Sequence, residues 1–305
     1  MKFSVSREQT EFAAALRRML AGTDVPAIAR AWATGDADPG RKLWSRLAEL
    51  GVTALGRTDS GATPVDLVLG FVELGRAAVP GPYVESVAVL PSLHPDADPD
   101  AIATLAVPPN VPYAVDGAVA DAVYLLDDGV LHTARVVGEL TSVDPSRRLA
   151  DVTPVDALGP ADCEAAVRRG ALATAAQVFG AGLALLDRST EYAKQRTQFG
   201  KPIGSFQAVK HQLADALVGL ELARPLLFGA ALELDTDTAV RDVSAAKVAC
   251  TDAAHRAARV ALQVHGAIGY TAEYDLALWL TKVRALVSAW GTQRLHRDQV
   301  WAAIA

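Results

Sequence analysis

Apolar residues recur at helical spacing along the first hundred positions of the chain. Phe12, Leu16 and Leu20 are four residues apart, and Ser6 precedes Gln9 by three residues, as in an N-terminal capping box. The same kind of spacing predicts four helices, over 4–35, 41–50, 64–78 and 84–93.

A different pattern covers residues 99–158, where short β-rich runs alternate with turn signals. Asp127-Asp128-Gly129 lies between two apolar runs, which is a strong hairpin signal. Helical spacing then returns, and predicts helices over 163–195, 205–233, 238–265, 273–289 and 292–304. We therefore expect a mainly α protein with a small β insert, divided into units at 1–98, 99–158 and 159–305.

Composition narrows the class of protein. The 305 residues are 51% hydrophobic, which excludes a disordered chain, and the net charge of −6 argues against a nucleic-acid partner. Cys163 and Cys250 form no CxxC pattern, so we expect no metal site and a cytoplasmic location. The uncharged stretch from Gly170 to Leu186 is short for a membrane span, so we interpret it as a buried core helix.

Two segments carry candidate chemistry. The first, at 196–215, reads RTQFGKPIGSFQAVKHQLAD and places Arg196 before a Gly/Pro turn, with Ser205 as the N-cap of the next helix. A guanidinium beside free helix N–H groups suits an anion such as pyrophosphate. An ordinary connection between helices with a surface arginine is the alternative.

The second segment, QVHGAIGYT, begins at Gln263 and contains two glycines three residues apart. Glycine allows a ligand to approach the backbone closely, but it also ends helices in proteins that bind nothing there. By itself this segment therefore leaves both interpretations open.

Together the two segments resemble the C-terminal domain of the acyl-CoA dehydrogenase family, in order, spacing and helical setting. LWSRLAELGVTALG at 43–56 and VLGFVELGRAAVPGPYVES at 68–86 resemble its N-terminal helical domain, and SVDPSRRLADV at 142–152 resembles the link leaving its middle β domain. The resemblance implies an N-terminal helical domain, a reduced middle β domain and a C-terminal four-helix bundle.

The resemblance also implies chemistry. The family uses FAD to remove hydrogens from Cα and Cβ of an acyl-CoA thioester, with a carboxylate as the base. By match with the family motifs, five residues would contact the ADP part of a neighbouring subunit's FAD: Arg196, Gln198, Phe199, Gln263 and Gly266. Thr292 matches a family residue that could touch flavin, although it could equally cap the last helix.

Both family positions for the catalytic base hold residues that cannot act as one. The glutamate of the family's Y-E-G-T motif falls on Trp290, and the alternative position at the start of the first C-terminal helix falls on Gly170. Tryptophan has no acceptor for a proton and glycine has no side chain. We therefore expect no catalytic residue in this chain, with Glu164 as the closest carboxylate to Gly170 on its N-terminal side.

The family's flavin-facing T-E-P-x-x-G-S-D motif is absent between positions 95 and 155, a segment too short for the full β domain. The missing features are those that a subunit supplies to its own active site, whereas the retained ones serve a partner. The chain thus resembles the short subunit of actinobacterial α2β2 acyl-CoA dehydrogenases of the steroid-degrading type. A larger subunit would carry the base, and an electron-transfer flavoprotein would accept the electrons.

Two other classes of function stay open: an autonomous dehydrogenase with a relocated base such as Glu164, and a structural paralogue without flavin. Trp290 itself would fill the space of an acyl chain or anchor an interface. We interpret Glu273 and Lys282 as solvated charges on a helix face.

Overall fold

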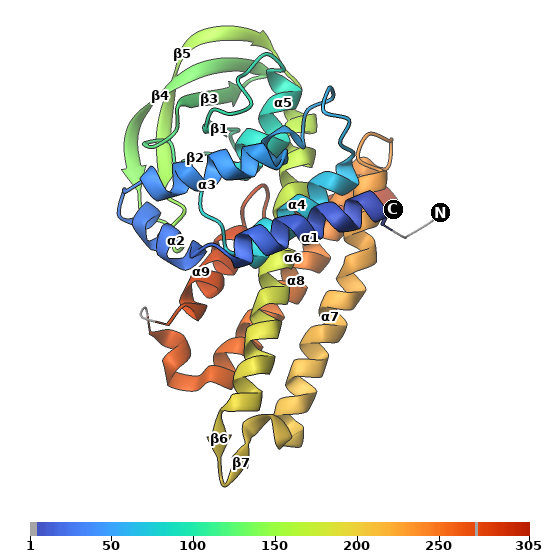
Figure 1. The fold of residues 1–305 in the computed structure, drawn as a ribbon. Helices are drawn as coiled ribbons and strands as arrows, with labels where there is room; N and C mark the ends of the chain where they lie inside the picture. Colours follow the sequence, from blue (N-terminus) through green and yellow to red (C-terminus); the bar gives the residue numbers. More distant parts are fainter. Residues whose placement is uncertain (1–4, 272–273) are drawn as a thin grey trace.

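The computed structural model describes residues 5–271 and 274–305, and a long central helix organises it (Figure 1). The N-terminal helices and the sheet lie around the upper part of this helix, α6 (Cys163–Gln195), in the view of Figure 1. The N-terminal block consists of α1 (Arg7–Ala21), α2 (Val25–Ala33), α3 (Asp38–Glu49), a 3-10 turn (Val52–Ala54), α4 (Pro64–Arg76), a π-helix (Val84–Val89) and α5 (Leu90–Leu93).

The helix predicted over 4–35 is two helices. α1 ends at the C-cap Gly22, and α2 begins again three residues later. The Asp24 carboxylate accepts the backbone N–H of Ala27, which caps the new helix. The predicted capping box at Ser6 and Gln9 is confirmed. Position 4, where the prediction began, lies outside the described residues.

The β insert forms one five-stranded sheet, in the order β1-β3-β4-β5-β2. Its strands are β1 (Ala103–Ala106), β2 (Ala114–Val115), β3 (Ala122–Asp127), β4 (Val130–Leu140) and β5 (Leu149–Pro160). The predicted hairpin is confirmed: Asp127 pairs with Val130, and Asp128 and Gly129 both have positive φ, 47° and 75°. Positive φ at both central residues is the primed turn that matches strand twist.

The C-terminal block consists of α6, α7 (Gln207–Leu232), α8 (Ala239–His265), α9 (Leu276–Leu286) and α10 (Gln293–Ile304). The far ends of α6 and α7 are joined by a small hairpin, β6 (Thr197–Gln198) and β7 (Lys201–Pro202), at the lower tip of Figure 1. Ser205 is not the N-cap of α7, because its hydroxyl donates to the carbonyl of Pro202 and Phe206 takes the cap position. Position 273, where a helix was predicted to begin, lies outside the described residues.

The uncharged stretch of α6, Gly170–Leu186, is buried throughout, as predicted. The helix is long and apolar enough to cross a membrane, but 94% of its most apolar window is covered by the rest of the fold. α4 crosses it closely at two glycines: a Cβ at Gly75 would lie 1.9 Å from the Gln177 carbonyl oxygen, and one at Gly180 would lie 2.0 Å from that of Val72. This close crossing anchors the N-terminal block to the bundle.

Candidate functional site

Trp290 and Gly170, the two residues at the family base positions, are in direct contact. Trp290 is 0% exposed, and a Cβ built on Gly170 would lie 2.1 Å from both Cδ2 and Cε3 of its indole. The tryptophan backbone has φ of 55°, an uncommon conformation for a bulky residue. The indole therefore fills the space above Gly170, and only a residue without a side chain fits beneath it.

A buried carboxyl group lies beside this indole. Trp290 Nε1 donates to Oε1 of Glu85 at 2.9 Å, and Glu85 is 2% exposed. Burial raises the pKa of Glu85, while the positive charge of Arg147, 3.9 Å away, opposes that rise. Sequence reasoning missed Glu85, because nothing local links it to a residue 205 positions away.

Two buried side chains hold the turn that carries Trp290. His296 Nε2 lies 3.0 Å from the Trp290 carbonyl oxygen, and since a carbonyl only accepts, Nε2 carries the hydrogen. Lys247 Nζ donates to the Leu286 carbonyl oxygen at 2.8 Å. Burial lowers the pKa of Lys247 to about 7. The indole is thus fixed from both the side-chain and the backbone side.

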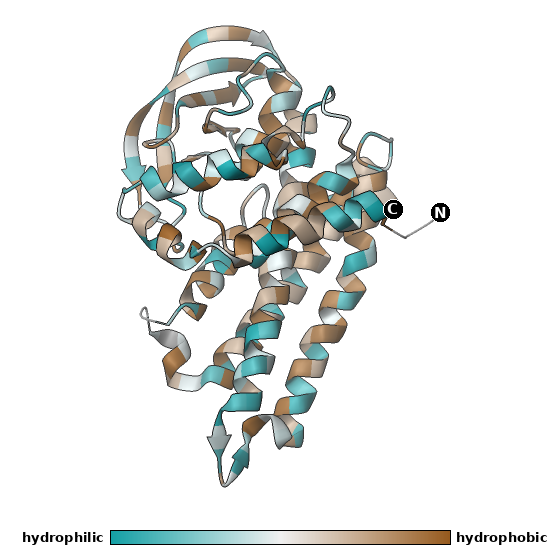
Figure 2. Ribbon diagram, in the orientation of Figure 1, coloured by the Kyte–Doolittle hydropathy of each residue, from teal (hydrophilic) through white to brown (hydrophobic). Residues whose placement is uncertain are grey.

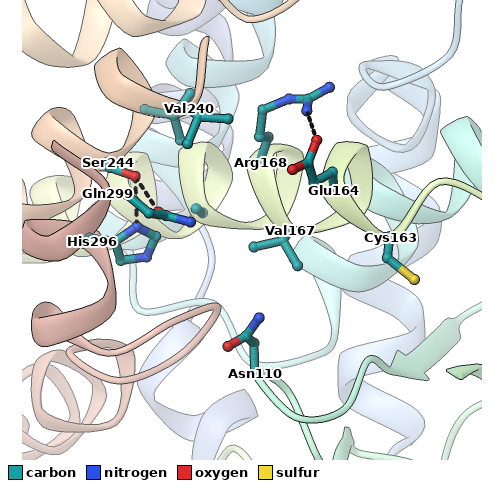
Figure 3. Close-up of a pocket in the computed structure, with 11 residues that line it drawn as sticks. Asn110, Cys163, Glu164, Val167, Arg168, Val240, Ser244, His296 and Gln299 are labelled. Carbon is teal, nitrogen blue, oxygen red and sulfur yellow. Dashed lines mark hydrogen bonds and ion pairs between the residues drawn. The ribbon is translucent and has the colours of Figure 1, made fainter. Parts of the chain in front are cut away.

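A small cavity lies at the start of α6, between α8, α10 and the loop at Asn110 (Figure 3). It measures about 170 Å³, less than the ~300–1,000 Å³ of typical ligand pockets. Ser244 and His296 lie on one wall, and Glu164 lies on the other. Glu164 is mostly exposed and pairs with Arg168 at 3.6 Å, so nothing directs its carboxylate toward Trp290.

The residues matched to the family's nucleotide contacts lie elsewhere. Arg196 is the C-cap of α6, Gln198 is in β6, and both are exposed. Phe199 has an apolar side chain, yet it is 91% exposed. Its backbone φ is 51°. An exposed guanidinium and an exposed aromatic ring on one tight hairpin suit a ligand or a partner.

The second motif reaches the same end of the bundle. Gln263 is on the last turn of α8, and Gly266 follows it with φ of 64°. Between them, the ring of His265 stacks on Tyr192 of α6, with centroids 4.3 Å apart. Tyr192 is one turn before Arg196, whose N–H donates to its carbonyl oxygen. The fold thus brings both motif segments to the end of the bundle that carries the β6–β7 hairpin.

Thr292 does not belong to that group. It follows Trp290 by two residues, and its hydroxyl accepts the N–H of Leu295 at 3.2 Å as the N-cap of α10. The helix-capping alternative is therefore what the geometry favours.

We expect Thr292→Ala to lower the free energy of unfolding by about 1 kcal/mol, because a helix N–H loses its partner. Chemical denaturation of the isolated chain measures the change. Thr292→Ser keeps the oxygen and should stay within about 0.5 kcal/mol of the wild type. Equal stability of the alanine and serine variants would contradict the capping role.

Lys282 is not the solvated charge that its sequence setting suggested. It is 3% exposed, and its Nζ donates to Oδ2 of Asp144 at 3.0 Å and to the Ser146 hydroxyl at 3.4 Å. This pair ties α9 to the segment between β4 and β5. The other residue of that interpretation, Glu273, lies outside the described residues.

Comparison with known proteins identifies the family. The family model "Acyl-CoA dehydrogenase, C-terminal domain" matches residues 161–305. Acyl-CoA dehydrogenase IpdE2 of Mycobacterium tuberculosis (strain ATCC 25618 / H37Rv) is 33% identical over 298 residues, which cover 90% of this chain and 92% of that protein.

Solved structures show the same fold. The ChsE4-ChsE5 complex from Mycobacterium tuberculosis contains a chain with a TM-score of 0.83 at 21% identity, covering 100% of this chain and 99% of that one. The Tcur3481-Tcur3483 steroid ACAD (G363A variant) gives a TM-score of 0.79 at 19% identity, covering 97% of each. The motifs, the fold and the similarity to IpdE2 over 92% of that protein together show the family. This chain belongs to the acyl-CoA dehydrogenase family.

Proposed function

We propose that this chain is the non-catalytic subunit of a heteromeric FAD-dependent acyl-CoA dehydrogenase. The observation that carries the proposal is the Trp290–Gly170 contact, which fills both family base positions with a packed indole. The buried carboxyl beside the indole, that of Glu85, already accepts a hydrogen bond from it. A partner subunit would therefore supply the base that removes the Cα proton.

FAD would be shared with that partner. Bound FAD supplies the acceptor for the Cβ hydride. The residues of this chain fit its ADP part: Arg196 offers a planar, exposed guanidinium for the pyrophosphate, and Phe199 offers an aromatic face that no described residue buries. Gln263 and Gly266 add an amide and an open backbone at the same end of the bundle. These groups would bind and orient the cofactor without taking part in proton transfer.

The outer face of α7 supports a partner surface. Hydrophobic and hydrophilic residues lie side by side along this helix (Figure 2). Val218, Leu222 and Leu226 are four residues apart, and all three are exposed. An apolar stripe on a bundle helix is a mark of an interface. We propose that the larger subunit covers it, in an α2β2 assembly.

The proposed substrate is a steroid-derived CoA ester, with an electron-transfer flavoprotein as the electron acceptor of the complex. The steroid ACAD among the solved relatives supports this substrate class. The two-component name of the ChsE4-ChsE5 complex supports a heteromeric assembly.

Co-expression with a larger acyl-CoA dehydrogenase-like partner tests the proposal. We expect the pair to co-purify with one FAD per heterodimer and to turn over an acyl-CoA, while this chain alone shows no turnover. Flavin absorbance against protein concentration measures the occupancy. Turnover by this chain alone with bound FAD would favour the autonomous enzyme, and a flavin-free complex would favour the structural paralogue.

Arg196→Ala should lower the flavin occupancy of that complex at least tenfold at limiting FAD, since a charge-assisted bidentate contact is lost. Assembly, measured by size-exclusion chromatography, should be unchanged. Arg294→Ala removes an equally charged side chain from the exposed face of α10 and serves as the matched control. Equal flavin content in the two variants would contradict the role of Arg196.

A further inference from the structure

A second cavity, separate from the one beside Ser244 and His296, lies next to the N-terminal helices. It forms where the end of α1 and the start of α2 meet α4, α6 and α9. Its volume is about 370 Å³, within the ~300–1,000 Å³ range of small-molecule pockets. Apolar side chains form part of its wall: Leu20, Val25, Ala184 and Trp279.

Three arginines and two carboxylates also line this cavity. Arg17 donates twice to Glu73, at 2.6 and 2.8 Å, and Arg76 donates to Asp187 at 2.6 Å. Each carboxylate is thus already matched by one arginine. The third arginine, Arg188, leaves the lining with one excess positive charge.

The guanidinium of Arg188 stacks on an aromatic ring. Its guanidinium carbon lies 3.8 Å from the ring centroid of Trp279, a cation–π contact. Within residues 5–271 and 274–305, its nitrogens make no hydrogen bond or ion pair. Trp279 is fixed in turn, because its Nε1 donates to the Arg76 carbonyl oxygen at 2.8 Å. Among the residues that the structure describes, none takes up the donors of this guanidinium, so they are available to a ligand in the cavity.

The Arg188 side chain lines the cavity but remains exposed to solvent. Partial burial lowers the pKa of its guanidinium, although Asp275 and Tyr274 oppose the change. Arg76 also has a buried Nε–H with no acceptor among the described residues. A donor without a partner in a low-dielectric site costs free energy that an anionic ligand would recover.

We propose that this cavity binds an organic monocarboxylate with a compact apolar body. A single negative charge matches the single excess positive charge, whereas a doubly charged phosphate would be repelled by Glu73 and Asp187. The fork of a guanidinium matches a carboxylate with two parallel hydrogen bonds. The apolar wall would cover a hydrocarbon body. This site is independent of the proposed FAD contacts.

Isothermal titration calorimetry of the full chain tests the proposal with four probes. Benzoate has both the charge and the apolar body, benzamide has the body without the charge, acetate has the charge with hardly any body, and inorganic phosphate has the higher charge. We expect benzoate to bind saturably, and each of the other three to bind at least tenfold more weakly. Equal binding of benzoate and benzamide, or no saturable benzoate binding, would overturn the proposal.

Variants of Arg188 connect the binding to this cavity. Arg188→Gln should weaken benzoate at least tenfold, and Arg188→Lys, which keeps the charge but not the fork, should give an intermediate affinity. Arg294→Gln, on the exposed face of α10, should bind as the wild type does. Circular dichroism checks that each variant is folded. Unchanged affinity in folded Arg188→Gln would place the binding elsewhere and refute the site.

Discussion

Replacing Trp290 with alanine should lower the free energy of unfolding by about 3–5 kcal/mol. The indole is fully buried, and the Gly170 backbone beneath it is held inside α6 and cannot collapse into the space left behind. The change also leaves the buried Glu85 carboxyl without the Nε1–H that it accepts. Urea denaturation of the isolated chain measures the loss.

Trp301→Ala is the matched control, because Trp301 is 70% exposed on α10. It should change the free energy of unfolding by less than about 0.5 kcal/mol. A similar small effect at Trp290 would contradict the close packing described for it.

The contact between Trp290 and Gly170 also predicts non-additive behaviour. Gly170→Ala alone should destabilise the fold, since the new Cβ would lie 2.1 Å from the indole carbons. In the Trp290→Ala background the same change should be neutral or stabilising, because it fills part of the cavity and favours helix. Simple addition of the two effects would show that the residues do not share this space.

The sequence predicted the helical blocks, the hairpin and the family because those signals are local. Helical spacing around Leu16 and the Asp-Gly turn at Gly129 involve residues within a few positions of one another. The break between α1 and α2 was missed although its signal is local too: Asp24 is a good N-cap and Pro26 is at a position that suits a helix start. The prediction of a single helix rested on the spacing of Phe12, Leu16 and Leu20, all of which precede this break.

The candidate site was only partly foreseen, for a physical reason. Counting along the family motifs led to Trp290 and Gly170, but not to the carboxyl that the indole binds. Glu85 and Lys282 look like ordinary helix charges in sequence, since burial and partners depend on how distant segments pack. Lys282 is 136 to 138 positions from the residues that it contacts. Spacing along one chain carries no information about such pairs.

Breaking the buried ion pair between Asp144 and Lys282 should be as costly as losing the indole. Asp144→Ala would leave the Lys282 ammonium charged and buried, for which about 3–5 kcal/mol of destabilisation is expected. Asp298 forms an ion pair with Arg294, and both side chains are largely exposed. Asp298→Ala should therefore lower the free energy of unfolding by less than about 1 kcal/mol. Chemical denaturation at neutral pH compares the two.

The double variant Asp144→Leu, Lys282→Met separates the loss of attraction from the cost of an unpaired charge. It removes both charges and keeps similar volumes, so it should recover most of the stability that Asp144→Ala loses. A double variant as unstable as Asp144→Ala would show that the cost does not come from the isolated ammonium.

The same pair predicts how stability depends on pH. Burial raises the pKa of Asp144, but the charge of Lys282 and hydrogen bonds from Lys282 and Ser146 outweigh it, so the pKa lies below its ordinary value of 3.8. A carboxyl whose native pKa is lowered stabilises the fold at pH above 3.8 and loses that contribution as the pH falls through the lower, native value. Unfolding free energies measured across this acid range should therefore fall less steeply in the double variant than in the wild type. Parallel curves would mean that Asp144 has the same proton affinity in the folded and unfolded chain, and would contradict the ion pair.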